Sequence, residues 1–186
     1  MPISFKIGVN SICNAKCKTC DIGSHNKDTT YYNNMNFNKM DLDYDIVLAA
    51  ITSLASVRPK VMIDTTEPLL YPRLFDLVRH IKRNNMDCRV QTNGLKLEKL
   101  AEQVVNSGID DIGVSIDGTS AVHDSIRGIP GMYNRILSGL CRVDELKKMN
   151  ALSKPHITIN NVISKHSQDV LVEFIHELSE KDISIK

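Results

Sequence analysis

The sequence predicts an α/β domain built on a parallel β-sheet, and three observations support this prediction. Short apolar segments alternate with amphipathic segments along the chain. The 186 residues, of which 42% are hydrophobic and 24% charged, can bury one continuous core. No linker separates a second domain. Regular alternation of strands and helices gives right-handed crossovers and a parallel sheet, which is either doubly wound or curled into all or part of a barrel.

Short apolar runs rich in β-branched residues predict the strands. In chain order they are SFKIGVN (4–10), KVMIDT (60–65), CRVQTN (88–93), DIGVSID (111–117) and HITINNVIS (156–164). A further run, ISIK (183–186), begins a sixth strand where the sequence stops. A native domain rarely stops inside a strand that no helix covers, so we expect residues 1–186 to be the incomplete core domain of a longer protein.

Amphipathic segments between these runs predict the helices, because their apolar residues recur every three to four positions. They are residues 43–56, 74–85, 96–108, 133–150 and 169–181. The Asn-rich segment 26–41 has no clear period, so we predict a loop there. Active sites of parallel α/β sheets lie at the carboxyl ends of the strands. Functional residues are therefore expected in the segments that follow each strand.

The charge balance disfavours two classes of partner. The chain has 23 basic and 22 acidic side chains, a formal net charge of +1 and no basic run. Neither nucleic acid nor a membrane surface is therefore predicted as a partner. The N-terminus lacks the regions of a signal peptide, and no window approaches about 18 apolar residues. We expect a cytoplasmic protein.

Three of the five cysteines lie within the stretch CNAKCKTC, at Cys13, Cys17 and Cys20. An odd count in a chain without a secretion signal argues for metal or redox chemistry rather than disulfides. A zinc site would need a fourth ligand, for which His25 is the only near candidate. A four-iron cubane held by three thiolates leaves one iron open to a substrate or cofactor. The spacing favours the cubane, and zinc is the alternative.

Polar side chains also follow the other predicted strands, where an apolar sheet has no structural need for them. Each alone has an ordinary explanation as a turn residue or a helix cap. Together, at one edge of a parallel sheet, they predict a binding site. These residues are Asn10, Asp64, Glu67, Gln91, Asn93, Ser115, Asp117, and Asn160 or Asn161.

Four stretches, in this order, resemble the radical S-adenosylmethionine (radical SAM) superfamily. The three clustered cysteines match its CxxxCxxC pattern after the first strand. EPLLYP (67–72) resembles its GGEPLL segment, and QTNG (91–94) resembles the end of its third strand. VSIDGTSAVHDSIRG (114–128) is similar to a fourth-strand signature common in the SPASM group, whose members carry an additional cysteine-rich domain. The similarity covers the core domain only, over nearly the whole chain.

The resemblance implies a partial (βα)6 barrel of the TIM type, truncated in its sixth strand, that binds a [4Fe–4S] cluster and S-adenosylmethionine (SAM). In this family the cluster reductively cleaves SAM to a 5′-deoxyadenosyl radical, which abstracts hydrogen from the substrate. The implied partners are a flavodoxin- or ferredoxin-like electron donor and a peptide or another biosynthetic intermediate. The protein itself would bind the cofactors and the substrate, orient them and exclude side reactions.

The resemblance also assigns roles to single residues. The three clustered cysteines would ligate the cluster. Thr65, Thr66 and Glu67 stand at the family's GGE position, whose backbone and carboxylate meet the methionine amino group of SAM. Glycine permits close backbone approach and positive φ, and β-branched residues resist both, so the threonine pair is the largest departure from the family. The Glu67 carboxylate still suits an ammonium group.

Further residues would complete the SAM pocket. Ser115 and Asp117 would reach the ribose or the methionine carboxylate, and Arg127 is a second candidate for that carboxylate. The residue before the last cysteine, usually aromatic in the family, is Thr19. The remaining pocket residues would be Asn93 and, beside the adenosine, Asn160 or Asn161. Candidates to replace the missing aromatic, or only to cover the rim of the barrel, are Tyr31, Tyr32 and Phe37.

Two other functions stay open at this point. If the threonines at 65–66 had cost the chain its SAM binding, it would be a non-catalytic iron–sulfur or metal-binding scaffold. A plain nucleotide-binding α/β domain is disfavoured, because the chain has no Gly-rich phosphate loop. The sequence does not identify a substrate, and no histidine is assigned a catalytic role.

Overall fold

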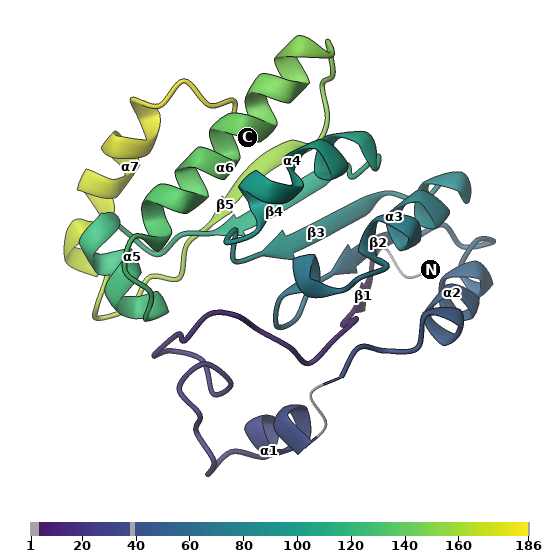
Figure 1. The fold of residues 1–186 in the computed structure, drawn as a ribbon, viewed down its shortest axis with the longest axis horizontal. Coiled ribbons are helices and arrows are strands. Elements are labelled where there is room, and N and C mark those ends of the chain that lie inside the picture. The colour runs from purple at the N-terminus through teal and green to yellow at the C-terminus, as the bar shows by residue number, and fades with distance from the viewer. Residues whose placement is uncertain (1–3, 38–39, 186) are drawn as a thin grey trace.

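The computed structural model describes residues 4–37 and 40–185, and the side chains of all of these except residues 36 and 37. Five parallel strands form one sheet in the order β1-β2-β3-β4-β5 (Figure 1). Successive strands are neighbours throughout, as in part of a barrel, whereas a doubly wound sheet reverses its order at a switch point. The predicted α/β fold is confirmed. The strands are β1 (Ser4–Ile7), β2 (Lys60–Ile63), β3 (Cys88–Thr92), β4 (Asp111–Ser115) and β5 (His156–Asn160).

One row of apolar side chains crosses the sheet and fixes its register. Ile7 pairs with Ile63, Ile63 with Val90, Val90 with Ile112, and Ile112 with Ile157. All of these except Ile7 are completely buried, and each contributes roughly 1.5–3 kcal/mol by its burial. A shift of one residue would turn a strand's apolar side chains to the opposite face, so this row determines which residues face the site.

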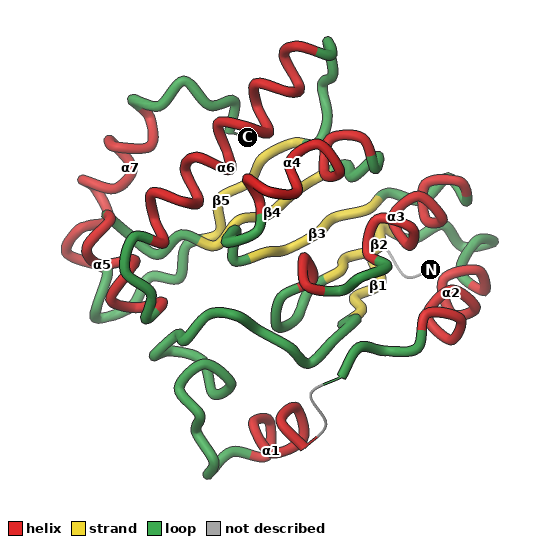
Figure 2. The backbone as a smooth tube through the Cα atoms, in the orientation of Figure 1, coloured by secondary structure: helices red, strands yellow, loops and turns green. Residues whose placement is uncertain are grey.

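All five predicted helices are present: four lie between successive strands, and the fifth follows β5 (Figure 2). They are α2 (Tyr44–Ser53), α3 (Leu74–Arg83), α4 (Leu97–Asn106), α6 (Met132–Met149) and α7 (Leu171–Ser179). Four side chains of α3 are buried in the core: Leu74, Leu77, Val78 and Ile81. In the described ranges, no helix combines the length and the apolar character that crossing a membrane requires. Short 3₁₀ turns are η1 (Pro68–Leu70) and η2 (Gln168–Val170).

The prediction of a loop over residues 26–41 is wrong in part, because α1 (Thr30–Phe37) lies within it. Thr29 Oγ1 accepts a hydrogen bond from Tyr32 N at 3.1 Å and so caps the first turn. Tyr32 is buried. The asparagines break the apolar period that would have revealed this helix from the sequence.

A second helix that the sequence analysis did not expect is α5 (Ser120–Arg127). It ends at Gly128, whose φ of +69° gives the left-handed cap that glycine supplies. His123 and Ile126 are its buried residues. In the sequence, the signal for this helix is Gly128, which follows a short apolar pattern.

Each predicted strand extends too far at its carboxyl end. The ladders stop at Ile7, Ile63, Thr92, Ser115 and Asn160. Beyond these points the chain leaves the ladder, and side chains supply part of the hydrogen bonding, as Asn10 does with Thr66. The polar ends of the runs therefore build loops at the edge of the sheet.

In the predicted sixth strand, one described residue pairs with the sheet. Ile185 forms an isolated parallel bridge with Ile157 of β5. Lys186, the last residue of the predicted strand, lies outside the described residues. The parallel order of the sheet thus continues past β5.

Candidate functional site

A cavity of about 330 Å³ lies at the carboxyl ends of the strands. The cysteine segment forms one side of it, and the loops after β2, β3 and β4 form the other. Among the residues predicted for the site, four do not line this cavity: Asn10, Glu67, Asn160 and Asn161. The predicted residues that the structure brings together are Cys13, Cys17, Cys20, Asp64, Thr65, Thr66, Gln91, Asn93, Ser115, Asp117 and Arg127.

Backbone hydrogen bonds hold the cysteine segment against the end of α5. Lys16 N donates to Arg127 O at 3.1 Å, and Lys18 N donates to Ile126 O at 2.8 Å. Gly128 permits this contact, because a Cβ there would lie 2.5 Å from Lys16 O. The helix therefore positions the cysteines relative to the sheet.

Two of the three thiols face hydrogen-bond donors. Cys13 Sγ accepts from Ala15 N at 3.5 Å and from Asn93 Nδ2 at 3.8 Å. Cys17 Sγ accepts from Arg127 Nη1 at 3.7 Å. Burial raises the pKa of both thiols, and these donors oppose that change. Donors and cations of this kind stabilise the thiolate, which is the form that binds metal.

A buried ion pair holds Arg127 beside Cys17. Arg127 Nε donates to Asp117 Oδ2 at 2.6 Å, and the two side chains are only 14% and 4% exposed. Asp117 is fixed in turn, because its backbone N donates to His123 Nδ1 at 3.1 Å. Arg127 is thus not an arginine of a solvated loop. It links the Asp117 carboxylate to the cysteine segment.

His123 is completely buried beneath this pair. Burial lowers its pKa to about 4, and the nearby Arg127 acts in the same direction. Asp117 and Asp124 act in the opposite direction. Because its Nδ1 accepts a hydrogen bond, the neutral ring carries its proton on Nε2, which has no hydrogen-bond partner among the described residues. The neutral His123 ring therefore accepts a hydrogen bond from the Asp117 backbone and so helps to position Asp117.

Acid is expected to destabilise the fold through His123. The unfolded chain has a histidine pKa of about 6.5, so it takes up the proton first, and stability is lost as the pH falls from about 6.5 to about 4. At about pH 5 the loss relative to pH 7 is about 2 kcal/mol. His123→Gln keeps a neutral acceptor and should lose less stability over that range. Urea unfolding of both proteins at the two pH values measures the difference, and equal losses would contradict this account.

Glu67 lies outside the cavity, and its predicted contact with the SAM amino group is not what the geometry presents. Its side chain is completely buried. Oε1 accepts from Leu69 N at 3.0 Å and Thr92 Oγ1 at 2.6 Å, and Oε2 accepts from Asn93 N at 2.7 Å. Burial raises the pKa of this carboxyl group, and the three donors oppose that. Glu67 therefore ties the turn after β2 to the loop after β3.

The threonine pair forms the turn that glycines would form. The backbone φ is +146° at Thr65 and +26° at Thr66, values that residues with a Cβ rarely adopt. Thr66 Oγ1 lies 2.9 Å from Asn10 O and 2.6 Å from Asn10 Oδ1. The β-branched side chains thus do not prevent the positive-φ turn, and both residues line the cavity.

Asn160 lies in a neighbouring cavity of about 230 Å³ rather than in the main one. Its amide bonds Gln91 and, at 3.2 Å, Arg89. Gly113 makes room for these three side-chain ends, because a Cβ there would collide with all of them. Asn161 Nδ2 donates to Ile116 O at 3.0 Å. Since Gln91 and Asp64 line both cavities, Asn160 is adjacent to the site but does not line its main cavity.

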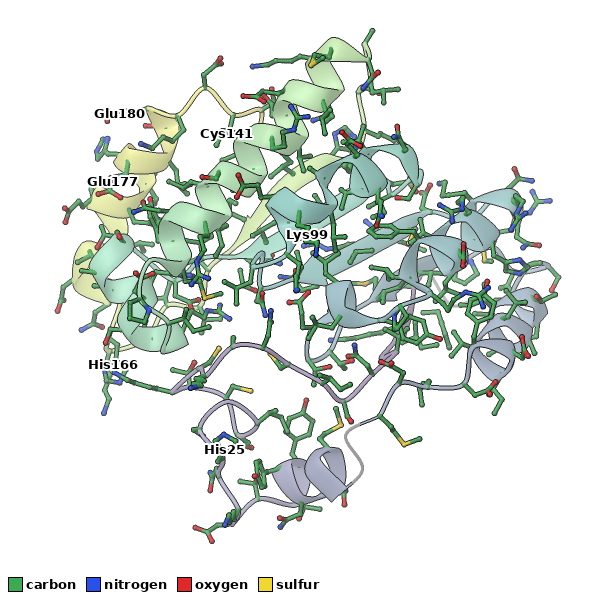
Figure 3. The ribbon with its side chains drawn as sticks, viewed as in Figure 1. His25, Lys99, Cys141, His166, Glu177 and Glu180 are labelled. Carbon is green, nitrogen blue, oxygen red and sulfur yellow. The ribbon has the colours of Figure 1, made fainter. Side chains whose placement is uncertain are left out.

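The candidates for the missing aromatic residue differ in whether they line the cavity. Tyr31 lines the cavity, as does Thr19. Tyr32 is buried against His25, with 3.2 Å between Tyr32 Oη and His25 Nδ1; Figure 3 labels His25 in the loop close to α1. The side chain of Phe37 lies outside the described residues. Tyr31 is therefore the described aromatic residue placed to face a ligand.

The arrangement of the thiols suits a four-iron cluster. Within residues 4–37 and 40–185, no group of three or more His, Cys, Asp or Glu side chains is arranged to hold a single metal ion. Cys13, Cys17 and Cys20 instead lie around one cavity. In a four-iron cluster each thiolate binds a different iron, so the ligands surround a volume. His25, the predicted fourth zinc ligand, bonds Tyr32 and does not line this cavity.

Two shaping residues were not predicted from the sequence. Gly23 packs on the cysteine segment, since a Cβ there would lie 2.4 Å from Cys17 N. His123 was recognised only as part of a motif, and its hydrogen bond to Asp117 depends on α5. Neither role has a signal in spacing alone, because both depend on how the chain folds back on itself, Gly23 onto Cys17 and His123 onto Asp117.

Comparison with known proteins agrees with this geometry. The family model described as the radical SAM superfamily matches residues 7–150. A probable GTP 3',8-cyclase of Methanococcus aeolicus is 30% identical over 171 residues, covering 88% of this chain and 51% of that relative. An AdoMet-dependent heme synthase of Methanosarcina barkeri is 29% identical over 126 residues, covering 66% and 34%. The chain thus spans about a third to a half of the length of these relatives.

Solved structures share the fold. SuiB of Streptococcus suis, bound to the precursor peptide SuiA, matches with a TM-score of 0.68 at 19% identity over 95% of this chain and 36% of that one. The protein anSMEcpe with bound AdoMet and Cp18Cys peptide matches with a TM-score of 0.71 at 17% identity, over 96% and 49%. The cofactors of the superfamily are a [4Fe–4S] cluster and SAM. With the matched family model spanning most of its length, this chain belongs to the radical SAM superfamily.

Proposed function

We propose that this chain is the core of a radical SAM enzyme. Cys13, Cys17 and Cys20 would hold a [4Fe–4S] cluster whose open iron binds SAM, and reductive cleavage of SAM would supply a 5′-deoxyadenosyl radical that abstracts hydrogen from the substrate. One observation carries the proposal: the three thiols and the Thr65–Thr66 turn line a single cavity at the carboxyl ends of the strands.

The charges in the cavity suggest how SAM would be oriented. Asp117 would repel the methionine carboxylate, so its remaining acceptor capacity suits the ribose hydroxyls. Arg127, which lies between Asp117 and Cys17, suits the carboxylate instead. Ser115 accepts a hydrogen bond from Gln91 at 3.0 Å and keeps its own proton free to donate. These roles place the methionine end of SAM toward the cysteines.

The other side chains of the cavity would exclude water and hold the adenine. Ala15, Ile22 and Val162 contribute apolar surface to the lining. Tyr31 would stack on the adenine in place of the aromatic residue that Thr19 replaces. A dry lining suits radical chemistry, because it keeps solvent from competing with the substrate.

The substrate proposed is a peptide or another biosynthetic intermediate with polar groups. The neighbouring cavity supports this, since Asp64, Arg89, Gln91 and Asn160 line it and it adjoins the SAM site. Peptides are bound in the two structural neighbours and GTP cyclases are among the relatives, so both substrate classes belong to the proposal. A flavodoxin- or ferredoxin-like electron donor, a cytoplasmic location and a single core domain over residues 1–186 complete it.

A direct test is to reconstitute the cluster anaerobically, add SAM and dithionite, and assay for 5′-deoxyadenosine. The proposal predicts that this product forms and that it requires both the cluster and the reductant. A cluster-loaded protein that binds no SAM and forms no 5′-deoxyadenosine would instead be the non-catalytic iron–sulfur scaffold.

Ser115→Ala is expected to weaken SAM binding by about two- to tenfold, because one neutral hydrogen bond is lost at the cavity. Calorimetric titration of SAM into the cluster-loaded protein measures this. Ser179→Ala is the matched control, since Ser179 is exposed at the end of α7 and bonds only its own helix at His176 O. If the two variants bind SAM equally well, Ser115 is not part of the site.

A further inference from the structure

The turn after β2 raises a structural question, because two β-branched residues hold positive φ angles there. Strained backbone of this kind persists only where surrounding contacts determine it, and it concentrates at ligand sites. The contacts come from the segment that follows β1, at Gly8 and Asn10. Each of these residues meets one of the two threonines.

Gly8 leaves the space that the Thr65 side chain fills. A Cβ at Gly8 would lie 2.4 Å from Thr65 Oγ1, 3.1 Å from its Cγ2 and 3.2 Å from its Cβ, and these are its three nearest atoms. The Thr65 Cβ carries two heavy atoms, Oγ1 and Cγ2, and both face Gly8. Rotation about χ1 can turn only one of them away at a time, so a Cβ at Gly8 would still meet the other. Thr65 Oγ1 is buried without a hydrogen-bond partner among the described residues. The side chain is therefore held by fit alone.

Asn10 anchors the second threonine through hydrogen bonds. Thr66 Oγ1 lies within bonding distance of both the Asn10 carbonyl and its side-chain oxygen. The Asn10 side-chain nitrogen donates to Glu67 O at 3.0 Å, so one side chain bonds both Thr66 and Glu67. Asn10 is only 4% exposed. It connects the segment that leads into the cysteines with the turn on the opposite side of the cavity.

We propose that Gly8 and Asn10 are positioning residues of the SAM site: they hold Thr65 and Thr66 in the backbone conformation that two glycines would otherwise supply. This rests on the proposed function, in which the turn meets the methionine end of SAM. It explains how a chain without the two glycines keeps the site. The turn itself has no glycine, but Gly8, which follows the neighbouring strand β1, leaves the space that the Thr65 side chain needs.

The first test uses Gly8→Ala, Thr65→Gly and the double variant, each loaded with cluster. Gly8→Ala should bind SAM at least about tenfold more weakly, because the new methyl group displaces the turn. Thr65→Gly is the reference for the double variant, because it removes the side chain that a methyl group at position 8 would meet, breaks no hydrogen bond and suits the φ angle. Adding Thr65→Gly to Gly8→Ala should restore binding. Iron content should be the same in all four proteins.

The second test addresses Asn10 and does not depend on Gly8→Ala folding. Thr66→Val keeps the shape of the side chain but removes the hydroxyl, so SAM binding should weaken while iron content stays constant. Thr66→Ser restores the hydroxyl and should recover most of the affinity. If the hydroxyl had a purely structural role, Thr66→Val would lower the unfolding temperature, and SAM affinity and iron content would fall together.

The outcomes distinguish the inference from the function on which it rests. If the original chain holds iron but binds no SAM, the proposed function fails. If the original chain binds SAM and Gly8→Ala binds it equally well, or the double variant binds no better than Gly8→Ala, the role of Gly8 is overturned. If Thr66→Val binds SAM as tightly as Thr66→Ser, the role of Asn10 is overturned.

Discussion

Replacing Cys17 with alanine is expected to abolish the iron–sulfur cluster. Reconstituted protein should hold about four irons per chain and absorb near roughly 400 nm, and the variant should lose both properties. Cys17 is the buried thiol of the three and the one that faces the Arg127 cation. Removing it leaves two thiolates, because the alanine methyl group that takes its place cannot bind iron. Iron analysis and the absorption spectrum measure the effect.

The matched control is Cys141→Ala. Cys141 is exposed on α6, on the helical side of the molecule and away from the cysteine segment (Figure 3). This variant should keep the full iron content and spectrum. Retention of iron by Cys17→Ala, or stoichiometric zinc with no iron in the original chain, would contradict the cluster assignment.

Asp117→Ala is expected to have the largest effect on stability. The change leaves the Arg127 guanidinium buried and unpaired, and breaking a buried ion pair in this way costs about 3–5 kcal/mol. It also removes a polar group of the cavity, so SAM binding should be lost in the same variant. Urea unfolding and calorimetric titration of SAM measure the two effects.

An exposed ion pair provides the control. Asp76 bonds Arg73 at 2.6 Å on the surface of α3, with both side chains well exposed. Asp76→Ala should cost far less stability, because solvent screens such a pair. If Asp117→Ala and Asp76→Ala lose similar amounts of stability, the pair between Asp117 and Arg127 does not hold the site together.

The sequence predicts the sheet well because its strands are buried, and burial leaves a strong apolar pattern. The row from Ile63 to Ile157 shows this, since each member lies in a recognisable apolar run. Strand ends are predicted less well. Asn93 and Asp117 continue the alternating pattern of their runs although neither pairs in a ladder. Their bonds are made by side chains, which periodicity does not describe.

The site was predicted where it depends on chain order and not where it depends on three-dimensional contacts. The cysteine spacing and Ser115 follow from order and spacing. Glu67 does not, because its burial depends on donors from β3 and the loop after it. The conformation of Thr65 likewise depends on the space at Gly8, a residue far away in the sequence. Intrinsic preference argued against that turn, and the tertiary structure overrides it.

The central claim is that one cavity holds both the cluster and SAM. The most direct measurement is the electron paramagnetic resonance spectrum of the dithionite-reduced, cluster-loaded protein, recorded with and without SAM. If SAM binds the open iron, its addition should change the spectrum, because the ligands of that iron change. The same addition to Gly8→Ala should change the spectrum less at an equal SAM concentration. Identical spectra with and without a saturating amount of SAM would contradict the claim.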